Sequence, residues 1–501
     1  MLAANSLPSR LRNVAERYAE QPAIRAQGHE ISYGALISMA NTLDRTLQIL
    51  SNNNTQIRIA IFTNRDVATY SAIYTCLANG YCYIPINPNW PNDRILNVFA
   101  QAKPSLVYCS SPDKNKHAME CVRAVQIPII HMSLDRDPIE FSVTDNIIFQ
   151  SHNLNNLAYI MFTSGSTGMP KGVPITYDNL LSYADSMIDI YPFSNMEIIA
   201  QAVEMTFDLS VHDMVLTWMQ GGKLLSIPAG AAQMAPRMIK NSNANHWLTV
   251  PSAAAQAKTL GLLKPKTLQS LKTLFFCGEA LPESLAITCA QAAPNARIVN
   301  LYGPTEATIA FSSYEWGISP NNNETVPLGE PIGNQQMKLS VDGEIMLSGL
   351  QLSPGYLNDN QKTKEKFVIE DGTRWYLTGD LGTYDQESGF LFRGRLDSQI
   401  KLRGYRVELG EVEGALRQSA NTDLVAAVAG SPDAPSSYTR LFGFVSGATF
   451  REQEIIFRLR EILPTYMIPD RIIFLESMPK NTNDKIDYVY LKELVGKNHD
   501  L

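Results

Sequence analysis

A loop of small residues with a single lysine is the segment of this sequence best equipped for chemistry. It runs from Thr163 to Gly172 and follows the apolar run Leu157–Phe162, which predicts a strand leading into the loop. Glycines let backbone amides approach an anion closely, hydroxyls add donors, and a lysine adds positive charge. The loop therefore indicates a polyphosphate site, whereas the alternative is a flexible Ser/Gly turn. Its contributing residues are Thr163, Ser164, Gly165, Ser166, Thr167, Gly168 and Lys171.

The spacing within this loop excludes two common nucleotide motifs. Pro170 stands where a Walker loop needs its second glycine, and Lys171 is followed by Gly172 rather than by serine or threonine. The loop also lacks the GxGxxG spacing of a dinucleotide fold. The sequence contains neither GxSxG nor HExxH, so the hydrolases that these motifs mark have no support.

Three later segments place reactive side chains beside turn residues. Asn300–Glu306 is a strand end followed by a Tyr-Gly-Pro turn, which presents an aromatic face and a carboxylate. Tyr376–Asp380 ends on a carboxylate that can only accept hydrogen bonds. Pro479–Asp487 carries Lys485 in a polar loop. Taken singly, each segment is equally typical of an ordinary surface turn.

These segments need a scaffold, and the pattern of apolar residues predicts one. Short apolar runs alternate with amphipathic stretches, as in Ile59–Phe62, the helical pattern that ends near Ala78, and Tyr83–Ile86. Such alternation is typical of a mainly parallel sheet covered by helices. Further strands are predicted at Leu106–Cys109, Ile129–Met132, Leu248–Val250, Leu274–Cys277 and Ile298–Leu301, and a helix at Ile95–Ala102.

The pattern changes after this α/β part. Short alternating segments between Gln335 and Gly394, separated by Gly, Asp and Pro, predict a β-rich subdomain. Beyond a boundary near Asp397, helix and strand patterns predict a small α+β unit. We therefore expect an α/β fold with a large N-terminal domain of layered α/β subdomains plus a β-rich subdomain, residues 1–396. A small mobile C-terminal α+β domain is expected over residues 397–501.

Composition favours a cytoplasmic enzyme. With 501 residues the chain is too long for one compact core, and 45% hydrophobic with 18% charged residues is ordinary for a globular protein. A net charge of -7 gives no general basic surface, so no nucleic acid is expected as a partner. The six cysteines lack the spacing of a zinc site or a disulfide scaffold. No secretory signal and no membrane span are expected, because no apolar run approaches about 20 residues.

Taken together and in this order, the segments resemble the signatures of the adenylate-forming superfamily. That superfamily includes acyl-CoA synthetases, luciferases and the adenylation domains of nonribosomal peptide synthetases. The resemblance covers nearly the whole chain, from Ile31-Ser32-Tyr33 and Gly80–Pro85 to Lys485, and Gly394–Glu408 is its longest match. It implies ATP and Mg²⁺ as cofactors, with Glu306 holding the metal. The implied ATP-binding residues are those of the loop together with Gly278, Glu279, Ala280, Tyr302, Gly303, Thr305, Asp380 and Arg395.

The resemblance also implies two catalytic lysines and a hinge. Lys485 would bridge the substrate carboxylate and the α-phosphate while ATP reacts. The small domain would then rotate about Asp397 and bring Lys401 to the site for a second half-reaction. Asp484 stands where the family usually has glycine, and Tyr488 stands where it usually has arginine.

Asp208 indicates the class of carboxylate. In Phe207-Asp208-Leu209-Ser210 it resembles the aspartate that pairs with the substrate ammonium in amino-acid-activating members, a charge-assisted bond that is strong when desolvated. The alternative is a helix N-cap. The family's pocket positions imply a small or medium uncharged side chain, because their linings are mostly apolar. These positions correspond to Asp208, Leu209, His212, Thr249, Phe275, Cys277, Leu301, Ile309 and Ala310.

The chain most resembles stand-alone amino-acid:carrier-protein ligases such as the D-alanine:carrier-protein ligases. This implies transfer of the amino acid to the phosphopantetheine thiol of a separate carrier protein. D-alanine is the leading substrate, although His212 stands where methionine is expected, and L-proline, L-alanine or another amino acid remain alternatives. An acyl- or aryl-CoA ligase of the same fold and a non-catalytic nucleotide-binding relative are the competing hypotheses.

Overall fold

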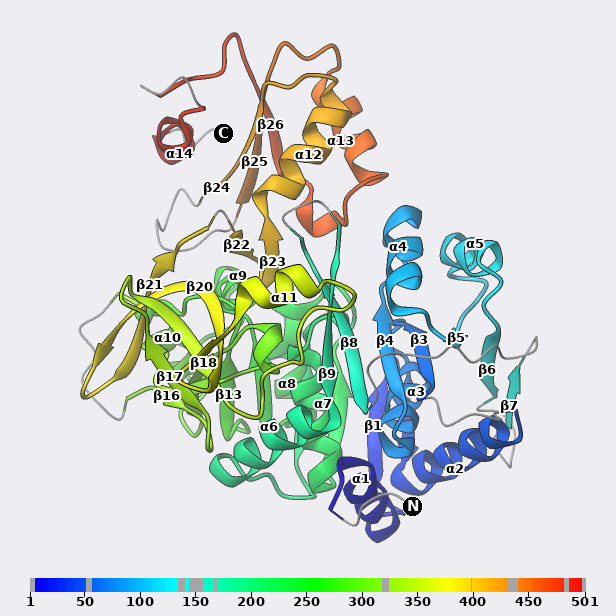
Figure 1. Cartoon of the computed structure of the whole chain (residues 1–501). Coiled ribbons are helices and arrows are strands. Elements are labelled where there is room, and N and C mark those ends of the chain that lie inside the picture. Colours follow the sequence, from blue (N-terminus) through cyan, green and yellow to red (C-terminus); the bar gives the residue numbers. More distant parts are fainter. Residues whose placement is uncertain are drawn as a thin grey trace.

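The computed structural model describes residues 5–50, 56–133, 140–143, 156–165, 169–317, 324–397, 399–430, 440–481 and 486–497. Two large sheets form most of the N-terminal part (Figure 1). The sequence predicted a mainly parallel sheet, and the structure divides these strands between two sheets. The nine-stranded sheet has the order β16-β15-β14-β13-β12-β10-β11-β1-β2, and the seven-stranded sheet has the order β7-β6-β5-β3-β4-β8-β9.

Parallel pairing occupies the middle of both sheets, and antiparallel strands lie at their edges. The strands of the nine-stranded sheet are β1 (Pro22–Ala26), β2 (His29–Ser32), β10 (Ile198–Gln201), β11 (Lys223–Ser226), β12 (His246–Thr249), β13 (Thr273–Phe276), β14 (Arg297–Tyr302), β15 (Ser312–Glu315) and β16 (Glu330–Pro331). Those of the seven-stranded sheet are β3 (Arg58–Phe62), β4 (Cys82–Ile86), β5 (Leu106–Tyr108), β6 (Ile129–Ser133), β7 (Glu140–Val143), β8 (Leu157–Thr163) and β9 (Lys171–Thr176).

Two central helices are buried on all sides. In α3 (Val67–Asn79) and α7 (Leu209–Gln220) almost every residue is buried, as expected for a helix that is apolar around its whole circumference. Asp66 caps the start of α3, and Gly80 ends it in a left-handed conformation. Tyr74 of α3 packs edge-on against Trp218 of α7, with 5.4 Å between ring centroids. The largest hydrophobic cluster includes both helices and residues of both large sheets.

The other helices of this part are α1 (Leu7–Arg17), α2 (Tyr33–Leu50), α4 (Asn92–Ala102), α5 (Lys116–Ala124), α6 (Tyr177–Ile190), α8 (Ala235–Ser242), α9 (Pro251–Thr259), α10 (Glu283–Ala292) and α11 (Asn360–Lys366), with short 3-10 turns η1 (Ala232–Met234) and η2 (Thr305–Ala307). The expected β-rich subdomain is a five-stranded antiparallel sheet. Its strands are β17 (Gln336–Leu339), β18 (Glu344–Ser348), β19 (Phe367–Glu370), β20 (Thr373–Asp385) and β21 (Gly389–Arg395).

The C-terminal part begins with a β hairpin that the sequence pattern did not predict, made by β22 (Gln399–Leu402) and β23 (Tyr405–Glu408). A three-stranded sheet follows, together with helices α12, α13 and α14, as expected for an α+β unit (Figure 1). Its elements are α12 (Leu409–Ala420), β24 (Val425–Gly430), β25 (Arg440–Ser446), α13 (Glu452–Arg460), η3 (Thr465–Met467), β26 (Arg471–Leu475) and α14 (Tyr488–Lys497). Two hydrophobic clusters, within residues 400–495, hold this part together.

Candidate active site

The small-residue loop lies between two antiparallel strands. β8 ends at Thr163 and β9 begins at Lys171, and these two residues are paired in register. A Cβ added to Gly165 would lie 2.0 Å from the Met169 carbonyl oxygen, so the backbone folds back too tightly for any other residue. Burial and the neighbouring Arg406 lower the pKa of Lys171 to about 8, against the effect of Glu408. The expected loop residues Ser166, Thr167 and Gly168 lie outside the described residues.

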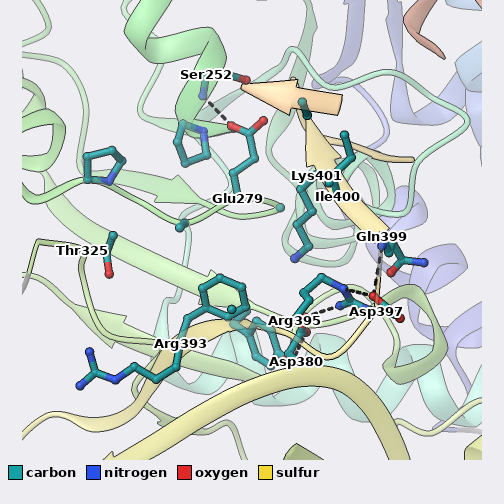
Figure 2. Close-up of a pocket in the computed structure, with 18 of the residues that line it drawn as sticks. Ser252, Glu279, Thr325, Asp380, Arg393, Arg395, Asp397, Gln399, Ile400 and Lys401 are labelled. Carbon is teal, nitrogen blue, oxygen red and sulfur yellow. Dashed lines mark hydrogen bonds and ion pairs between the residues drawn. The ribbon is translucent and has the colours of Figure 1, made fainter. Parts of the chain in front are cut away.

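Three of the residues expected at the nucleotide contact one another. The Tyr302 hydroxyl donates to Oδ2 of Asp380 at 2.7 Å, and Arg395 forms an ion pair with Oδ1 of the same carboxylate. Arg395 also donates twice to Asp397, at 2.7 and 2.9 Å (Figure 2). Tyr302 ends β14, Asp380 lies in β20 and Arg395 ends β21, so two sheets position this group. Gly303 follows Tyr302 at the end of β14.

Glu306 is buried, and both of its carboxylate oxygens have hydrogen-bond partners. It follows Thr305 in η2, and its Oε1 accepts the Tyr356 hydroxyl at 2.7 Å. The Arg406 guanidinium donates to both of its oxygens, at 2.8 and 3.1 Å. Although burial opposes ionisation, Arg406 and Tyr356 lower the pKa of Glu306 to about 2. This arrangement does not fit Mg²⁺, because a cationic side chain already holds the expected ligand.

Glu279, expected at the nucleotide between Gly278 and Ala280, joins the core to the hairpin. Its carboxylate accepts the Ser252 amide at 2.7 Å (Figure 2). It also accepts the amide of Gly404, in the turn between β22 and β23, at 2.6 Å. Gly404 has a φ of +81°, and a Cβ there would lie 2.5 Å from Cγ1 of Val250. Glycine at this turn thus permits the close approach of the hairpin to α9.

A cavity of about 1110 Å³, slightly above the usual size range of small-molecule sites, is lined by Glu279, Tyr302, Asp380 and Arg395. Residues of both parts of the chain line it. Lys401 projects from β22 into this space (Figure 2), and its ammonium lies 5.6 Å from the Tyr302 ring centroid. The core contributes Gly278, Glu279, Ala280, Leu301, Tyr302 and Asp380, while the C-terminal part contributes Lys401, Gly410, Glu413, Tyr488 and Lys492.

Asp208 precedes α7 without capping it. Its side chain makes no cap hydrogen bond to the helix, and Oδ2 has no hydrogen-bond partner among the described residues. Burial raises the pKa of Asp208 to about 6, opposed by a hydrogen bond from Thr305. Buried carboxylates normally have partners, so this oxygen is available to a ligand. The capping alternative is not supported by this geometry.

The other expected pocket residues are buried around the carboxyl ends of neighbouring strands, the usual place for a ligand in an open α/β sheet. Thr249 ends β12, Phe275 and Cys277 lie at the end of β13, and Leu301 lies in β14. Burial raises the pKa of the Cys277 thiol to about 12, so it is no nucleophile at neutral pH. Leu209, His212, Ile309 and Ala310 are likewise buried.

His212 belongs to a buried aromatic cluster. Its Nδ1 lies 2.6 Å from the Tyr183 hydroxyl, and its ring meets Phe275 edge-on at a centroid distance of 5.0 Å. Phe275 in turn meets Tyr191 edge-on at 5.1 Å. Burial lowers the pKa of His212 to about 3, so the imidazole is neutral. In the tautomer with the ring proton on Nε2, Nδ1 accepts a hydrogen bond from the Tyr183 hydroxyl.

Sequence reasoning missed several of these residues. Tyr183 and Tyr356 lie outside every motif, and no sequence signal marked them. Arg406 was within the recognised segment Gly394–Glu408, but nothing in the sequence indicated that it would contact Glu306. The expected catalytic Lys485 lies outside the described residues, so its role stays a prediction.

Comparison with known proteins identifies the class of this layered α/β enzyme. The sequence model of the AMP-binding enzyme family matches residues 11–357. The chain therefore belongs to the AMP-binding enzymes. No helix within the described residues has the length and apolarity needed to cross a membrane.

Individual relatives agree with this family. The chain is 30% identical over 503 residues to a linear gramicidin synthase protein of Brevibacillus parabrevis, but it spans only 10% of that protein. It is 29% identical to a D-alanine–D-alanyl carrier protein ligase of Staphylococcus aureus, with 97% of this chain and 99% of the relative aligned. The fold matches the crystal structure of the Vibrio cholerae adenylation domain AlmE in complex with glycyl-adenosine-5'-phosphate, with a TM-score of 0.88, 26% identity and 99% coverage of both chains.

Proposed function

We propose that this enzyme uses ATP to activate a small or medium uncharged amino acid as an aminoacyl adenylate. It then transfers the aminoacyl group to the phosphopantetheine thiol of a separate carrier protein. In the first step a carboxylate oxygen attacks the α-phosphorus and pyrophosphate leaves. In the second step the thiol sulfur attacks the carbonyl carbon, a thioester forms and AMP leaves.

The unpaired carboxylate oxygen of Asp208 carries the amino-acid assignment. A buried carboxylate with one oxygen unpaired and no cation beside it among the described residues is costly, and a substrate ammonium would supply the opposite charge and a further hydrogen bond. Acids without an amine would leave Asp208 uncompensated. This argues against an acyl- or aryl-CoA ligase.

The size assignment rests on the aromatic cluster. Tyr183, His212, Phe275 and Tyr191 are in contact and nearly or fully buried, which limits the space beside Asp208. D-alanine remains the leading candidate. The full-length similarity to a D-alanine–D-alanyl carrier protein ligase supports it, and the structural similarity to a glycyl-adenylate complex supports a small side chain.

For the nucleotide, the proposed roles follow from the hydrogen-bonding capacities of the side chains. Tyr302 offers its ring to the adenine, and its hydroxyl together with Arg395 fixes the Asp380 carboxylate. The remaining lone pairs of Asp380 can accept the ribose hydroxyls. The amides, hydroxyls and ammonium of residues 163–171 would bind the phosphates. We assign the first half-reaction to Lys485 and the second to Lys401, with residues 1–396 and 397–501 as domains that move about Asp397.

Amino-acid-dependent exchange of pyrophosphate into ATP tests this function. The panel should include D-alanine, L-alanine, glycine, L-proline, larger amino acids and amine-free acids, with Lys485→Ala as the inactive control. We expect exchange with one or a few small amino acids. No exchange with any amino acid would refute the proposal, and exchange only with amine-free acids would favour the CoA-ligase hypothesis.

A further inference from the structure

His212 and Asp208 lie on the same face of α7. They are four residues apart, a spacing that makes two side chains neighbours on a helix. Asp208 is 7% exposed and His212 is 1% exposed. Burial, followed by the neighbouring Cys277 and Asp208, raises the pKa of the Tyr183 phenol well above its usual value. These four side chains therefore belong to one buried site.

The Tyr183 hydroxyl decides which ring nitrogen of His212 carries the proton. The hydroxyl oxygen and Nδ1 lie 2.6 Å apart, so one of them donates to the other. Within the described part of the chain, Nδ1 is the one hydrogen-bond partner of this hydroxyl. A proton on Nδ1 would leave the phenol proton without an acceptor in a buried site, which is costly. The phenol therefore donates to Nδ1, and the proton of the neutral imidazole is on Nε2.

The Nε2–H group of His212 is then a buried donor that needs an acceptor. Among the described residues Nε2 has no hydrogen-bond partner. Buried donors normally have one, so Nε2–H is available to a ligand beside Asp208. A methyl side chain such as that of alanine would leave this donor unpaired, whereas a hydroxyl oxygen would accept its hydrogen bond. Most other positions of the expected pocket are apolar, namely Leu209, Phe275, Leu301, Ile309 and Ala310.

We propose that Tyr183 positions His212 as a hydrogen-bond donor to the substrate, and that the activated amino acid carries a side-chain hydroxyl, as serine and threonine do. This rests on the proposed amino-acid activation and narrows its substrate class. An amide side chain fits less well, because its two N–H donors would need acceptors in a mostly apolar wall. A side-chain carboxylate would find no opposite charge on a neutral imidazole. Similarity to a D-alanine ligase supports the size of alanine, and serine exceeds that size by one oxygen atom.

Paired amino acids test the hydroxyl requirement in the pyrophosphate-exchange assay. Serine is compared with alanine, and threonine with the isosteric valine, each as both enantiomers. We expect kcat/KM to be about tenfold higher for the hydroxylated member of each pair that is accepted, because the other member leaves Nε2–H unpaired. An equal or higher kcat/KM for alanine and valine would overturn the proposal.

The variant Tyr183→Phe tests the positioning role. Without the phenol, the His212 ring is free to turn or to move its proton to Nδ1, so the ratio of kcat/KM for serine to kcat/KM for alanine should fall about tenfold. The value for alanine itself should change less than about threefold. Tyr177→Phe is the matched control, because it also removes a buried phenol of α6, whose hydroxyl donates to the Tyr81 carbonyl at 2.8 Å. Equal ratios in the two variants would contradict the role of Tyr183.

The position of the proton is measured on the wild-type enzyme by NMR with ¹⁵N-labelled histidine. His212→Gln identifies the His212 signals by their loss. We expect the proton on Nε2 at neutral pH, and a proton on Nδ1 would overturn the proposal. This measurement needs no activity. Exchange with no amino acid would refute the proposed function, whereas exchange that favours alanine over serine would refute this inference alone.

Discussion

Asp208 is the residue on which the proposed substrate class depends most. It was recognised from a four-residue segment, and its burial and unpaired oxygen could be seen only in the fold. The sequence also supplied a competing interpretation, a helix cap, which the missing cap hydrogen bond does not support. Local sequence gives the type of a side chain, whereas its partners come from segments far away in the chain.

Asp208 predicts a pH dependence of substrate binding. Burial raises its pKa to about 6, so the carboxylate that pairs with an ammonium is lost as the pH falls through 6. We expect the KM for the amino acid to be lowest above this pH and to rise about tenfold per pH unit below it. Exchange assays between pH 5 and 8 at constant ionic strength measure this.

The matched variant is Asp208→Asn, which cannot ionise. It should weaken amino-acid binding by about 2–5 kcal/mol, because it removes one partner of a buried charge pair. The KM of this variant should no longer change between pH 5 and 7. A variant that kept the same pH profile would show that another group is titrating.

Tyr183 predicts a change in substrate range. Tyr183→Phe removes the hydrogen bond that fixes the His212 ring, so the imidazole can turn away from the substrate. We expect the ratio of kcat/KM for valine to kcat/KM for alanine to rise about tenfold, which is the usual discrimination of an apolar pocket against one or two extra methylene groups. Tyr191→Phe, at the other end of the cluster, is the control. An unchanged ratio in Tyr183→Phe would exclude a role in specificity.

At the scale of elements, the hairpin of β22 and β23 shows where prediction from sequence ends. Buried strands such as β3, β4 and β14 are runs of apolar residues, and the pattern predicted them within a few residues. The hairpin instead carries charged residues, of which Arg403 forms an ion pair with Asp470 and Arg406 with Glu306, both far away in the sequence. Its position on the core depends on Glu279 and Glu306, which no local pattern reveals.

The turn of this hairpin predicts a selective effect of one methyl group. In Gly404→Ala the new Cβ would clash with Val250, and the positive φ would add about 1–2 kcal/mol of strain. We expect faster hydrogen exchange across residues 399–408 and slower transfer to the thiol. Gly447→Ala is the control, because its φ is +71° but the nearest atom to the added Cβ is 3.8 Å away. Equal effects of both variants would mean that backbone strain alone matters.

At the scale of the whole molecule, the hydrophobic clusters of residues 400–495 are separate from those formed by residues 7–390. The parts meet through polar contacts and a few aromatic rings rather than through a shared core. An interface of this kind permits relative movement. The division at residue 396 stays a prediction.

Separate cores predict separate unfolding. Leu416→Ala, in a hydrophobic cluster of the C-terminal part, should lower the free energy of unfolding of one calorimetric transition by about 2–5 kcal/mol, the usual cost of such a cavity. Leu274→Ala, in the core of the nine-stranded sheet, should lower the free energy of unfolding of the other transition. A single transition that both variants shift alike would show one cooperative unit and would contradict the proposed domains.

The six cysteines, Cys76, Cys82, Cys109, Cys121, Cys277 and Cys289, are all free and buried. Burial raises the pKa of each thiol, so little reactive thiolate forms at neutral pH. The thiols of the native enzyme should accordingly react little with maleimides. A cysteine introduced at the exposed Phe457 position would accept a fluorophore selectively, and its emission would report changes in the surroundings of α13 during turnover.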